Sequence, residues 1–581
     1  MLLLWSLEIS FTWAVIALTF IGLGSLVLAR LGAEYSLFDA FWMGLAVSVA
    51  LLEIWNLFLP ITSSTTVFAF CAGLLGLLAN RSAILGRLRT ALQSTPGLNL
   101  LAIAIILFIA MRSAGPCENY DTGLYGASAV RWVQTYPAVP GLANLHGRLG
   151  FNSSVFLIIA ALDQGIWRGL AHHLFVGFLT AAFCLVLLPA CVRIAGKKTD
   201  SPADWFHSIL AIPAIFWAAR SMMVGTQTDE PAAIVCLISA GILFESHCQS
   251  DEESQAGPAL SRLFVAATLF SLAVSFKLST IVFALLVLCL VFHRIWLLGR
   301  SSKLLTSYLT AALVLSTLIL LPWCVRGVIL SGYPFFPATV FGFPFDGRVP
   351  LPVAKWYVIA VKSWGQMPGT PVADLHSLAW LSSWLNHAIR NRAAFQVPLG
   401  ISLAGLAAGL VGLIRSRSRP HYPWLWLLLP ALAGTVFWLL ASPDLRFGQF
   451  TIWTAAGTLG TWGIVSVTSG RPAAYSRAAL AMLLLSLLWC LVSFGWNEPY
   501  RSLLAVKKLT SLPKVDLVVR HTSSGLAIYV PAQGQQCWDA PLPCTPYFDE
   551  SLRLRNESSM RWGFTSEGRA AETQSPKGPS Q

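Results

Sequence analysis

Charged residues are scarce in this chain of 581 amino acids: Asp, Glu, Lys and Arg make up 11% of it, and 56% is hydrophobic. Soluble domains typically carry about 25% charged residues. The apolar residues come in blocks of about 16–24, long enough to cross a hydrocarbon core of about 30 Å. Because backbone amides find no water there, such blocks must be helices. The composition therefore excludes a soluble protein with a single core and predicts an all-α polytopic membrane protein.

The motifs of nucleotide-binding and zinc-binding proteins are also missing. The chain has no GxxxxGK loop followed by Ser or Thr and no strand-bounded GxGxxG, which argues against ATP hydrolysis and a nucleotide-sugar donor. It has no CxxC or HxxxH pair, so no structural zinc site is expected. The sequence thus requires no cofactor. A divalent metal stays open because a pair of Asp residues can hold Mg²⁺ through waters.

Nucleic-acid binding is not expected despite the net charge of +13. Lys and Arg lie in short loops between apolar blocks, whereas a nucleic-acid site gathers them with aromatics on one face. In such loops they set membrane topology and contact anionic lipid, so membrane lipid is an expected partner. Seven of the 11 cysteines lie inside apolar blocks, where they are most simply small hydrophobic residues.

The apolar blocks predict fourteen membrane spans. Residues 153–168 are apolar but short and contain Asp163, so we expect a half-inserted or in-plane helix there. The N-terminus lacks the basic region of a secretory signal peptide, so the first span is expected to be retained. The predicted spans are 9–29, 39–59, 64–80, 97–113, 170–193, 206–220, 229–247, 261–276, 278–297, 304–325, 395–414, 422–440, 447–467 and 478–496.

The distribution of basic residues predicts an orientation. Short loops and span ends on one side hold sixteen Lys and Arg, whereas the short loops on the other side hold only Arg220, Lys277 and Arg446. Because basic loops stay in the cytoplasm, the first side is expected to be cytoplasmic. Longer segments and the C-terminus then face outward, and we expect a multi-pass protein of a bacterial inner membrane with a periplasmic C-terminus.

These predictions divide the chain into seven parts. In the small outer region, VDLVVR (515–520) and GLAIYVP (525–531) predict two short strands. Cys537 and Cys544 could close a disulfide loop in an oxidising compartment, the alternative being two free thiols. The parts are N-terminal helices 1–113, a first outer loop 114–169, a central bundle 170–325, a second outer loop 326–394, C-terminal helices 395–496, a small α+β outer domain 497–564 and a disordered tail 565–581.

Acidic and basic side chains from five separate elements collect on the predicted outer face. Ionisable groups at membrane depth are costly, and their default interpretation is a functional site. The candidates are Asp121, His146 and Arg148 in the first outer loop, Asp229 and Glu230 at the start of a span, Lys277 in a tight turn, Arg326 at a span end, and Asp444 and Arg446 in the turn SPDLRF.

Each candidate also has a purely structural interpretation. Asp121 is placed to cap an amphipathic helix that would lie on the membrane surface. Asp229 and Glu230 could simply open a helix, with their charges against its dipole. Lys277 and Arg446 could extend toward the interface while their stems stay in the apolar region.

A lipid-linked sugar phosphate suits such a face, because its tail stays in the bilayer while its head reaches the surface. A carboxylate would take a proton from an acceptor hydroxyl as that oxygen attacks the sugar C1. Lys and Arg would neutralise the departing phosphate.

Four stretches resemble an uncharacterised family of bacterial multispanning membrane proteins. They are YDTGLYGASAVRWVQTYPAVPGLANLHGRLGFNSS (120–154), PWCVRGVILSGYPFFP (322–337), SPDLRF (442–447) and CWDAPLPCTPYF (537–548). More distantly, the order of long spans, a first outer loop with an acid and a second acid at a later outer helix start resembles the GT-C superfamily, whose members use polyprenyl-phosphate sugars.

The GT-C resemblance implies a hexosyl or pentosyl transferase that acts on an envelope glycan or lipid. It implies that Asp121 is the base or a metal-coordinating acid, and that Asp229 is the second acid. Lys277 or Arg326 would contact the donor phosphate. Further candidates for substrate contacts are Arg446, Glu230, His146 and Arg148.

Two other functions stay open. An envelope polysaccharide polymerase or ligase would also use a lipid-linked donor, and the many Arg and His residues of loop 326–394 are compatible with it. A flippase or transporter of lipid-linked glycans is less favoured, because transporters usually carry internal repeats and charges near the membrane midplane. A structural scaffold is the remaining alternative.

Overall fold

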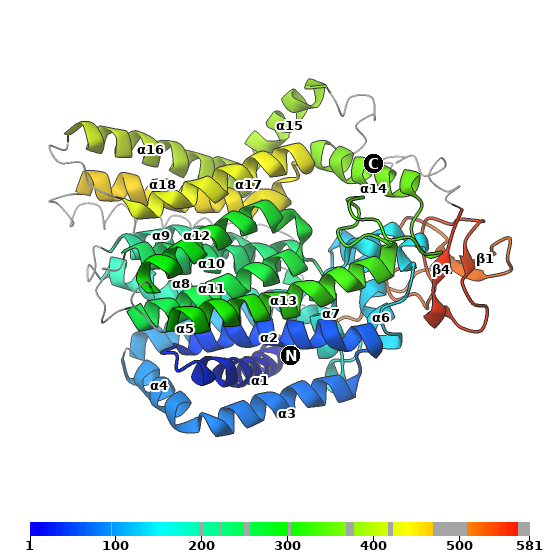
Figure 1. The fold of residues 1–581 in the computed structure, drawn as a ribbon, viewed down its shortest axis with the longest axis horizontal. Coiled ribbons are helices and arrows are strands. Elements are labelled where there is room, and N and C mark those ends of the chain that lie inside the picture. Colours follow the sequence, from blue (N-terminus) through cyan, green and yellow to red (C-terminus); the bar gives the residue numbers. More distant parts are fainter. Residues whose placement is uncertain are drawn as a thin grey trace.

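The computed structural model describes residues 1–94, 96–196, 201–219, 223–248, 256–299, 304–367, 377–415, 422–468 and 508–567. These residues are mostly helical, with a small sheet region near the C-terminus. The long helices run side by side in one stack, and the C-terminal strands lie at one end of it (Figure 1). We call this end of the stack the strand end.

Ten helices of the described chain are long and apolar enough to cross a membrane, which makes this a multi-pass membrane protein. An eleventh span results if α3 (Ser63–Ala79) and α4 (Arg81–Ser94), which are bent by 82° relative to each other, count as one. The ten contain α1 (Leu2–Arg30), α2 (Leu37–Phe58), α5 (Pro96–Ser113), α8 (Phe175–Ala195), α10 (Asp229–Cys248), α11 (Ala256–Phe276), α12 (Ile281–Gly299), α13 (Leu304–Ser331), α16 (Val397–Arg415) and α17 (Leu428–Ala441).

Other predicted spans have different outcomes. The segments 206–220 and 447–467 form α9 (Pro202–Ala219) and α18 (Gln449–Thr468), which are helices outside these ten. The predicted span 478–496 lies outside the described residues. The predicted span 304–325 ends too early, because α13 continues to Ser331.

Glycines let the first helices approach each other closely. A side chain at Gly44 of α2 would collide with the backbone carbonyl of Phe20 in α1, and one at Gly22 with that of Gly73 in α3. Small residues at such crossings are typical of membrane helices, where packing rather than apolar burial drives association. The N-terminal helices thus form a tight layer, at the bottom of Figure 1.

The first large loop is folded against the protein. The segment 153–168 forms only the short helix α7 (Val155–Leu162) and a turn at Gly165–Trp167, so it does not span a membrane. Residues 122–135 form a π-helical turn, Thr122–Gly126, followed by α6 (Ala127–Thr135). The prediction of a helix on the membrane surface was wrong here, because the apolar side of α6 is buried against α7 and the C-terminal region.

The C-terminal region carries the two predicted strands. β1 (Leu517–His521) pairs antiparallel with β2 (Ala527–Pro531), and β3 (Arg553–Leu554) pairs with β4 (Phe564–Thr565). The amide of Phe564 donates to the carbonyl of Pro140 at 2.9 Å, and Arg555 pairs with Asp346. The first outer loop, the second outer loop and the C-terminal region, which the sequence predicts on the same side of the membrane, therefore meet at the strand end.

Two more helices complete this end. They are α14 (Leu351–Gln366) and α15 (Ala379–Arg390), both within the predicted loop 326–394. The Ser442 hydroxyl, after α17, donates to the carbonyl of Val361 in α14 at 2.9 Å. The Tyr357 hydroxyl of α14 accepts from the amide of Gly147 in the first loop. α14 therefore connects two turns that carry candidate site residues.

Candidate functional site

Six charged side chains from distant segments meet near the strand end, and we call them the charge cluster. Three are acids and three are bases, so the cluster is formally neutral. The members are Asp121 before the π-helical turn, Arg148 in the turn Gly147–Phe151, Asp229 at the start of α10, Lys277 after α11, and Asp444 and Arg446 between α17 and α18.

Arg446 is the centre of the charge cluster, because its guanidinium faces three carboxylates. Its Nη2 lies 3.0 Å from Asp444 Oδ2, and its Nη1 lies 3.5 Å from Asp121 Oδ2 and 3.8 Å from Asp229 Oδ2. Burial opposes the charge of Arg446, but Asp444 and the other acids raise the net pKa of the guanidinium above its usual value. Arg446 therefore stays positively charged, and an additional anion would have to compete with these three carboxylates for the guanidinium.

Asp444 is fixed by its neighbour in the turn. Its Oδ1 accepts from the Arg446 amide at 3.0 Å, which begins the short helix Leu445–Gly448. Burial would raise the pKa of Asp444, but the paired guanidinium holds it below the usual value. The turn SPDLRF therefore positions Arg446 through both its backbone and its side chain.

Lys277 faces the other side of Asp229. Its Nζ donates to Asp229 Oδ1 and also lies 3.6 Å from the ring centre of Phe447. Burial and, next, the neighbouring Arg446 lower the pKa of Lys277 to about 7. Lys277 is therefore paired within the protein, and Asp229 joins it to Arg446.

Asp121 lies between two guanidinium groups. Arg148 Nη1 donates to its Oδ1 at 3.1 Å, and Arg446 approaches its Oδ2. The interpretation of Asp121 as a simple helix cap was wrong, because its side chain makes no capping hydrogen bond. The carboxylate is 23% exposed and therefore reaches solvent from within the cluster.

Glu230 and His146 border the charge cluster. Glu230 is the buried second residue of α10 and is one of the acids that favour the charge of Arg446. His146 is buried between the rings of Tyr125 and Tyr547, at centroid distances of 6.5 and 5.2 Å. Burial, together with the charge of Arg148, lowers the pKa of His146 to about 3. His146 is therefore neutral near pH 7 and adds no positive charge for a phosphate.

Arg326 does not join the charge cluster. It is buried in α13, where its Nε donates to Asn56 Oδ1 at 3.1 Å and its Nη1 donates to Asn152. Glu53 of α2 is a further charged neighbour. The prediction that Arg326 lies just beyond a span was wrong, and this side chain ties the first loop to α2 and α13.

A cavity of about 240 Å³ adjoins the charge cluster. Arg446 and Asp444 line it from one side, and His387 of α15 and Gln449 of α18 are among its other lining residues. Neither Asp121 nor Asp229 belongs to its lining. Open space therefore adjoins Arg446 and Asp444, whereas Asp121 and Asp229 lie outside the lining of this cavity.

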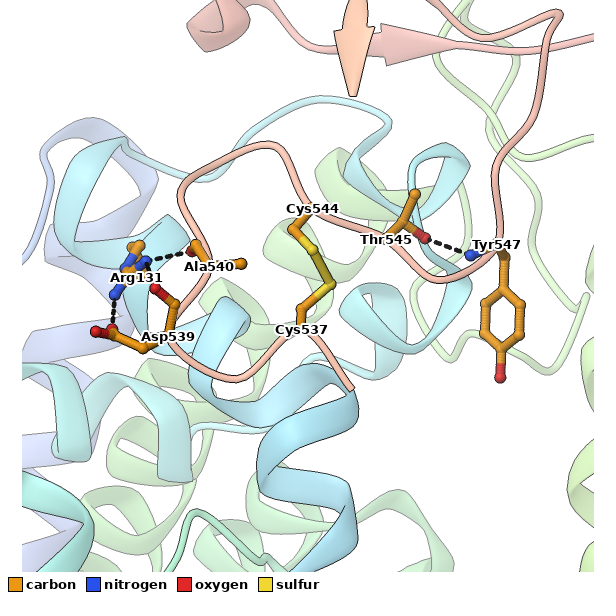
Figure 2. Close-up of a disulfide and its surroundings, with 7 residues drawn as sticks. All are labelled: Arg131, Cys537, Asp539, Ala540, Cys544, Thr545 and Tyr547. Atoms are coloured by element: carbon orange, nitrogen blue, oxygen red, sulfur yellow. Dashed lines mark hydrogen bonds and ion pairs between the residues drawn. A yellow bond between two sulfur atoms is a disulfide. The ribbon is translucent and has the colours of Figure 1, made fainter. Parts of the chain in front are cut away.

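The C-terminal region holds the segment that carries Asp121. Cys537 and Cys544 form a disulfide, and the loop between them contacts Arg131 of α6 (Figure 2). Arg131 pairs with Asp539 and donates to the backbone carbonyls of Asp539 and Ala540. We call residues 535–547 the C-terminal clamp.

The clamp also grips the chain on both sides of Asp121. The amide of Trp538 donates to the Gly123 carbonyl at 3.0 Å, and the Gln536 side chain donates to the Tyr120 carbonyl at 3.1 Å. Tyr547 reaches His146, as noted above. These contacts could not be predicted from the sequence, because more than 400 positions separate the residues and no pairing motif links them.

The charge cluster is built from ion pairs between side chains. In the described part of the chain, no group of three or more His, Cys, Asp or Glu residues is arranged to hold a metal ion. Asp121 and Asp229 each contact at least two cationic side chains. In this arrangement, a bound anion would replace one of the cluster's own carboxylates as the partner of a cationic side chain.

Comparisons with known proteins give a family and no further relatives. Residues 7–453 match the family described as "Domain of unknown function (DUF8201)", and the chain belongs to that family. The match includes every member of the charge cluster but ends before the C-terminal clamp. No curated protein and no solved structure matched the chain.

Proposed function

We propose that this member of the DUF8201 family is an integral membrane glycosyltransferase of the GT-C type. It would transfer a sugar from a polyprenyl-phosphate donor to an envelope glycan or lipid, at the outer face of a bacterial inner membrane. The observation that carries the proposal is the arrangement around Arg446: a solvent-reaching carboxylate, Asp121, on one side and the Asp229–Lys277 pair on the other.

The donor phosphate would bind to Arg446 and Lys277. A guanidinium binds phosphate through a planar fork of N–H donors, and an ammonium adds a compact charge. The phosphate would compete with Asp121 for Arg446, whose Nη1 is already 3.5 Å from the carboxylate and is held only loosely by it. Donor binding would therefore release Asp121 Oδ2, while Arg148 keeps Oδ1 in place.

The released carboxylate oxygen would act as the general base. It would take the proton of an acceptor hydroxyl while that oxygen forms a bond to the sugar C1. The bond from C1 to the phosphate oxygen would break, and the phosphate would leave with the electron pair. Arg446 and Lys277 would stabilise the charge that develops on this leaving group.

The position of the charge cluster supports a lipid-linked donor. Asp229 begins one candidate span, and Lys277 lies between two others. A phosphate carried on a membrane-embedded tail reaches this depth without leaving the bilayer. The absence of nucleotide-binding motifs in the sequence agrees with a donor of this class.

A polysaccharide polymerase or ligase is the second candidate, and one observation favours it. His387 of α15 lines the cavity beside Arg446, so this part of loop 326–394 supplies a histidine next to a permanent cation. In that reaction His387 rather than Asp121 would accept the proton. Replacing each residue separately distinguishes the two functions.

The test is a genetic deletion complemented with variants of the full chain. The strain would receive wild-type protein, Asp121→Asn, His387→Ala or the control Asp346→Asn, whose carboxylate is 61% exposed and lies outside the charge cluster. Envelope glycans and lipid-linked sugars would be measured in each strain, together with the amount of folded protein in the membrane.

The glycosyltransferase proposal expects that deletion and Asp121→Asn both remove one sugar from the envelope, while the lipid-linked donor accumulates. Asp346→Asn should restore the parental pattern. Loss with His387→Ala but not with Asp121→Asn would favour the ligase. An unchanged envelope in the deletion strain would contradict both.

A further inference from the structure

Helix α4 departs from the direction of the spans around it. It begins directly after α3, at an angle of 82°, and α5 follows it back into the bundle. α4 lies at the end of the stack opposite the C-terminal strands (Figure 1). A helix that connects two apolar helices and runs across their direction lies where the membrane meets water.

Exposed leucines and arginines share one side of α4. At 100° per residue, Leu85, Leu88 and Leu92 fall within about 60° of the helix circumference, Arg81 lies among them and Arg89 lies next to them, whereas Arg87 lies about 100° away from their other edge. The three leucines are 61, 40 and 56% exposed, so the protein itself does not cover them. The sequence of α4 contains no acidic residue.

The contacts of α4 with the protein use a different part of its surface. Ile84 is buried, and the Arg87 guanidinium lies 4.0 Å from the ring centre of Tyr35. Ile84 and Arg87 thus hold α4 on the bundle by the side next to the leucine stripe, and the stripe itself stays uncovered by the protein. The exposed leucines, with Arg81 among them and Arg89 beside them, therefore form one surface that fits an apolar layer bordered by negative charge.

We propose that α4 lies in the membrane interface and binds the headgroups of anionic phospholipids. The leucines would enter the boundary of the acyl chains, as amphipathic helices do to a depth of about 5–10 Å. Arg81 and Arg89, which are both exposed, would contact the phosphates above them. This surface is far from the charge cluster and does not depend on the function proposed for it.

The test measures lipid binding by the full-length protein purified in a neutral detergent. Fluorescent phosphatidylglycerol is the anionic probe, and phosphatidylcholine with the same acyl chains is the neutral one. The variant replaces the exposed Arg81 and Arg89 with Gln and keeps Arg87, which packs on Tyr35. A matched control replaces two exposed arginines of the C-terminal region, Arg553 and Arg561, with Gln.

Each arginine near an anionic surface strengthens binding by about fivefold, so the α4 variant should bind phosphatidylglycerol at least tenfold more weakly. The control should bind it like the wild type, and phosphatidylcholine binding should not change. If the α4 variant proves unfolded, the single change Arg89→Gln serves instead, with an expected loss of about fivefold. Equal binding of the two lipids by the wild type, or unchanged binding by the variants, would overturn the proposal.

Discussion

Removing the guanidinium of Arg446 tests whether the charge cluster is held together as its geometry indicates. In Arg446→Met the side-chain volume is roughly kept, but three carboxylates lose a shared partner. Asp229 keeps Lys277 and Asp121 keeps Arg148, whereas Asp444 loses the guanidinium that it contacts at 3.0 Å. We expect Asp444 to account for most of the loss of stability.

The size of the loss follows from the exposure of the partners. Breaking a fully buried ion pair costs about 3–5 kcal/mol, and a fully exposed pair contributes about 0–1 kcal/mol. The side chains of Arg446 and Asp444 are 26 and 18% exposed, between these limits. We therefore expect Arg446→Met to lower the free energy of unfolding by about 2–3 kcal/mol.

The assay is unfolding of the purified protein by increasing mole fractions of dodecyl sulfate in mixed micelles, followed by tryptophan fluorescence. Arg555→Met is a matched control, because Arg555 is also 26% exposed but its partner Asp346 is 61% exposed. We expect the control to lose no more than about 1 kcal/mol. The double variant Arg446→Met/Asp444→Asn should regain about 1 kcal/mol, because the unpaired carboxylate is gone.

Two results would refute this reasoning. Arg446→Met could unfold at the same dodecyl sulfate fraction as Arg555→Met, which would mean that the charge cluster is no more coupled than a surface pair. The double variant could also be no more stable than Arg446→Met. In that case the unpaired Asp444 carboxylate would not be the source of the loss.

Three further predictions concern other parts of the molecule. Because the pKa of Lys277 is lowered to about 7, the ammonium loses its charge as the pH rises from 6 to 8, and binding of polyprenyl phosphate should weaken over this range. Lys277→Arg should remove this pH dependence. The same pH profile for the wild type and for Lys277→Arg would contradict the prediction. Reducing the Cys537–Cys544 disulfide should increase the rate of amide hydrogen exchange in residues 120–131 and leave the rate in α10 unchanged. Equal exchange rates in residues 120–131 before and after reduction would show that the clamp holds this segment without the disulfide. Gly44→Leu should push α1 away from α2 and lower the yield of folded protein, whereas Gly86→Leu, in open space, should not.

The sequence was sufficient for the membrane class and for the expectation that charged residues from distant segments lie together. Apolar block length predicts spans because the bilayer thickness is fixed, and the position of a charge at a span end predicts which residues can meet. The position of Asp229 at a span start, of Lys277 and Arg446 in turns, and of Asp121 in the first outer loop predicts one common face, and the structure brings these four side chains together.

The partners of these residues were harder to predict, because they depend on side-chain packing between distant segments. Arg326 was assigned to the site by its nearness to a span end, but Asn56 and Asn152 provide acceptors deeper in the protein. A Cys537–Cys544 disulfide was among the expectations, but the contacts of Tyr547 and the C-terminal clamp with the first loop had no sequence signal. The bend that creates α4 was missed because its residues were interpreted only as topology-setting charges.

The C-terminal clamp has a consequence for the order in which the protein is assembled. Residues 535–547 are made after every other segment that surrounds the charge cluster, yet they hold the chain on both sides of Asp121. During synthesis, the helices that carry Asp229, Lys277 and Arg446 are therefore inserted before the Asp121 segment is secured. A chain without residues 535–547 would contain all the residues of the cluster but lack the contacts that fix the Asp121 segment on both sides.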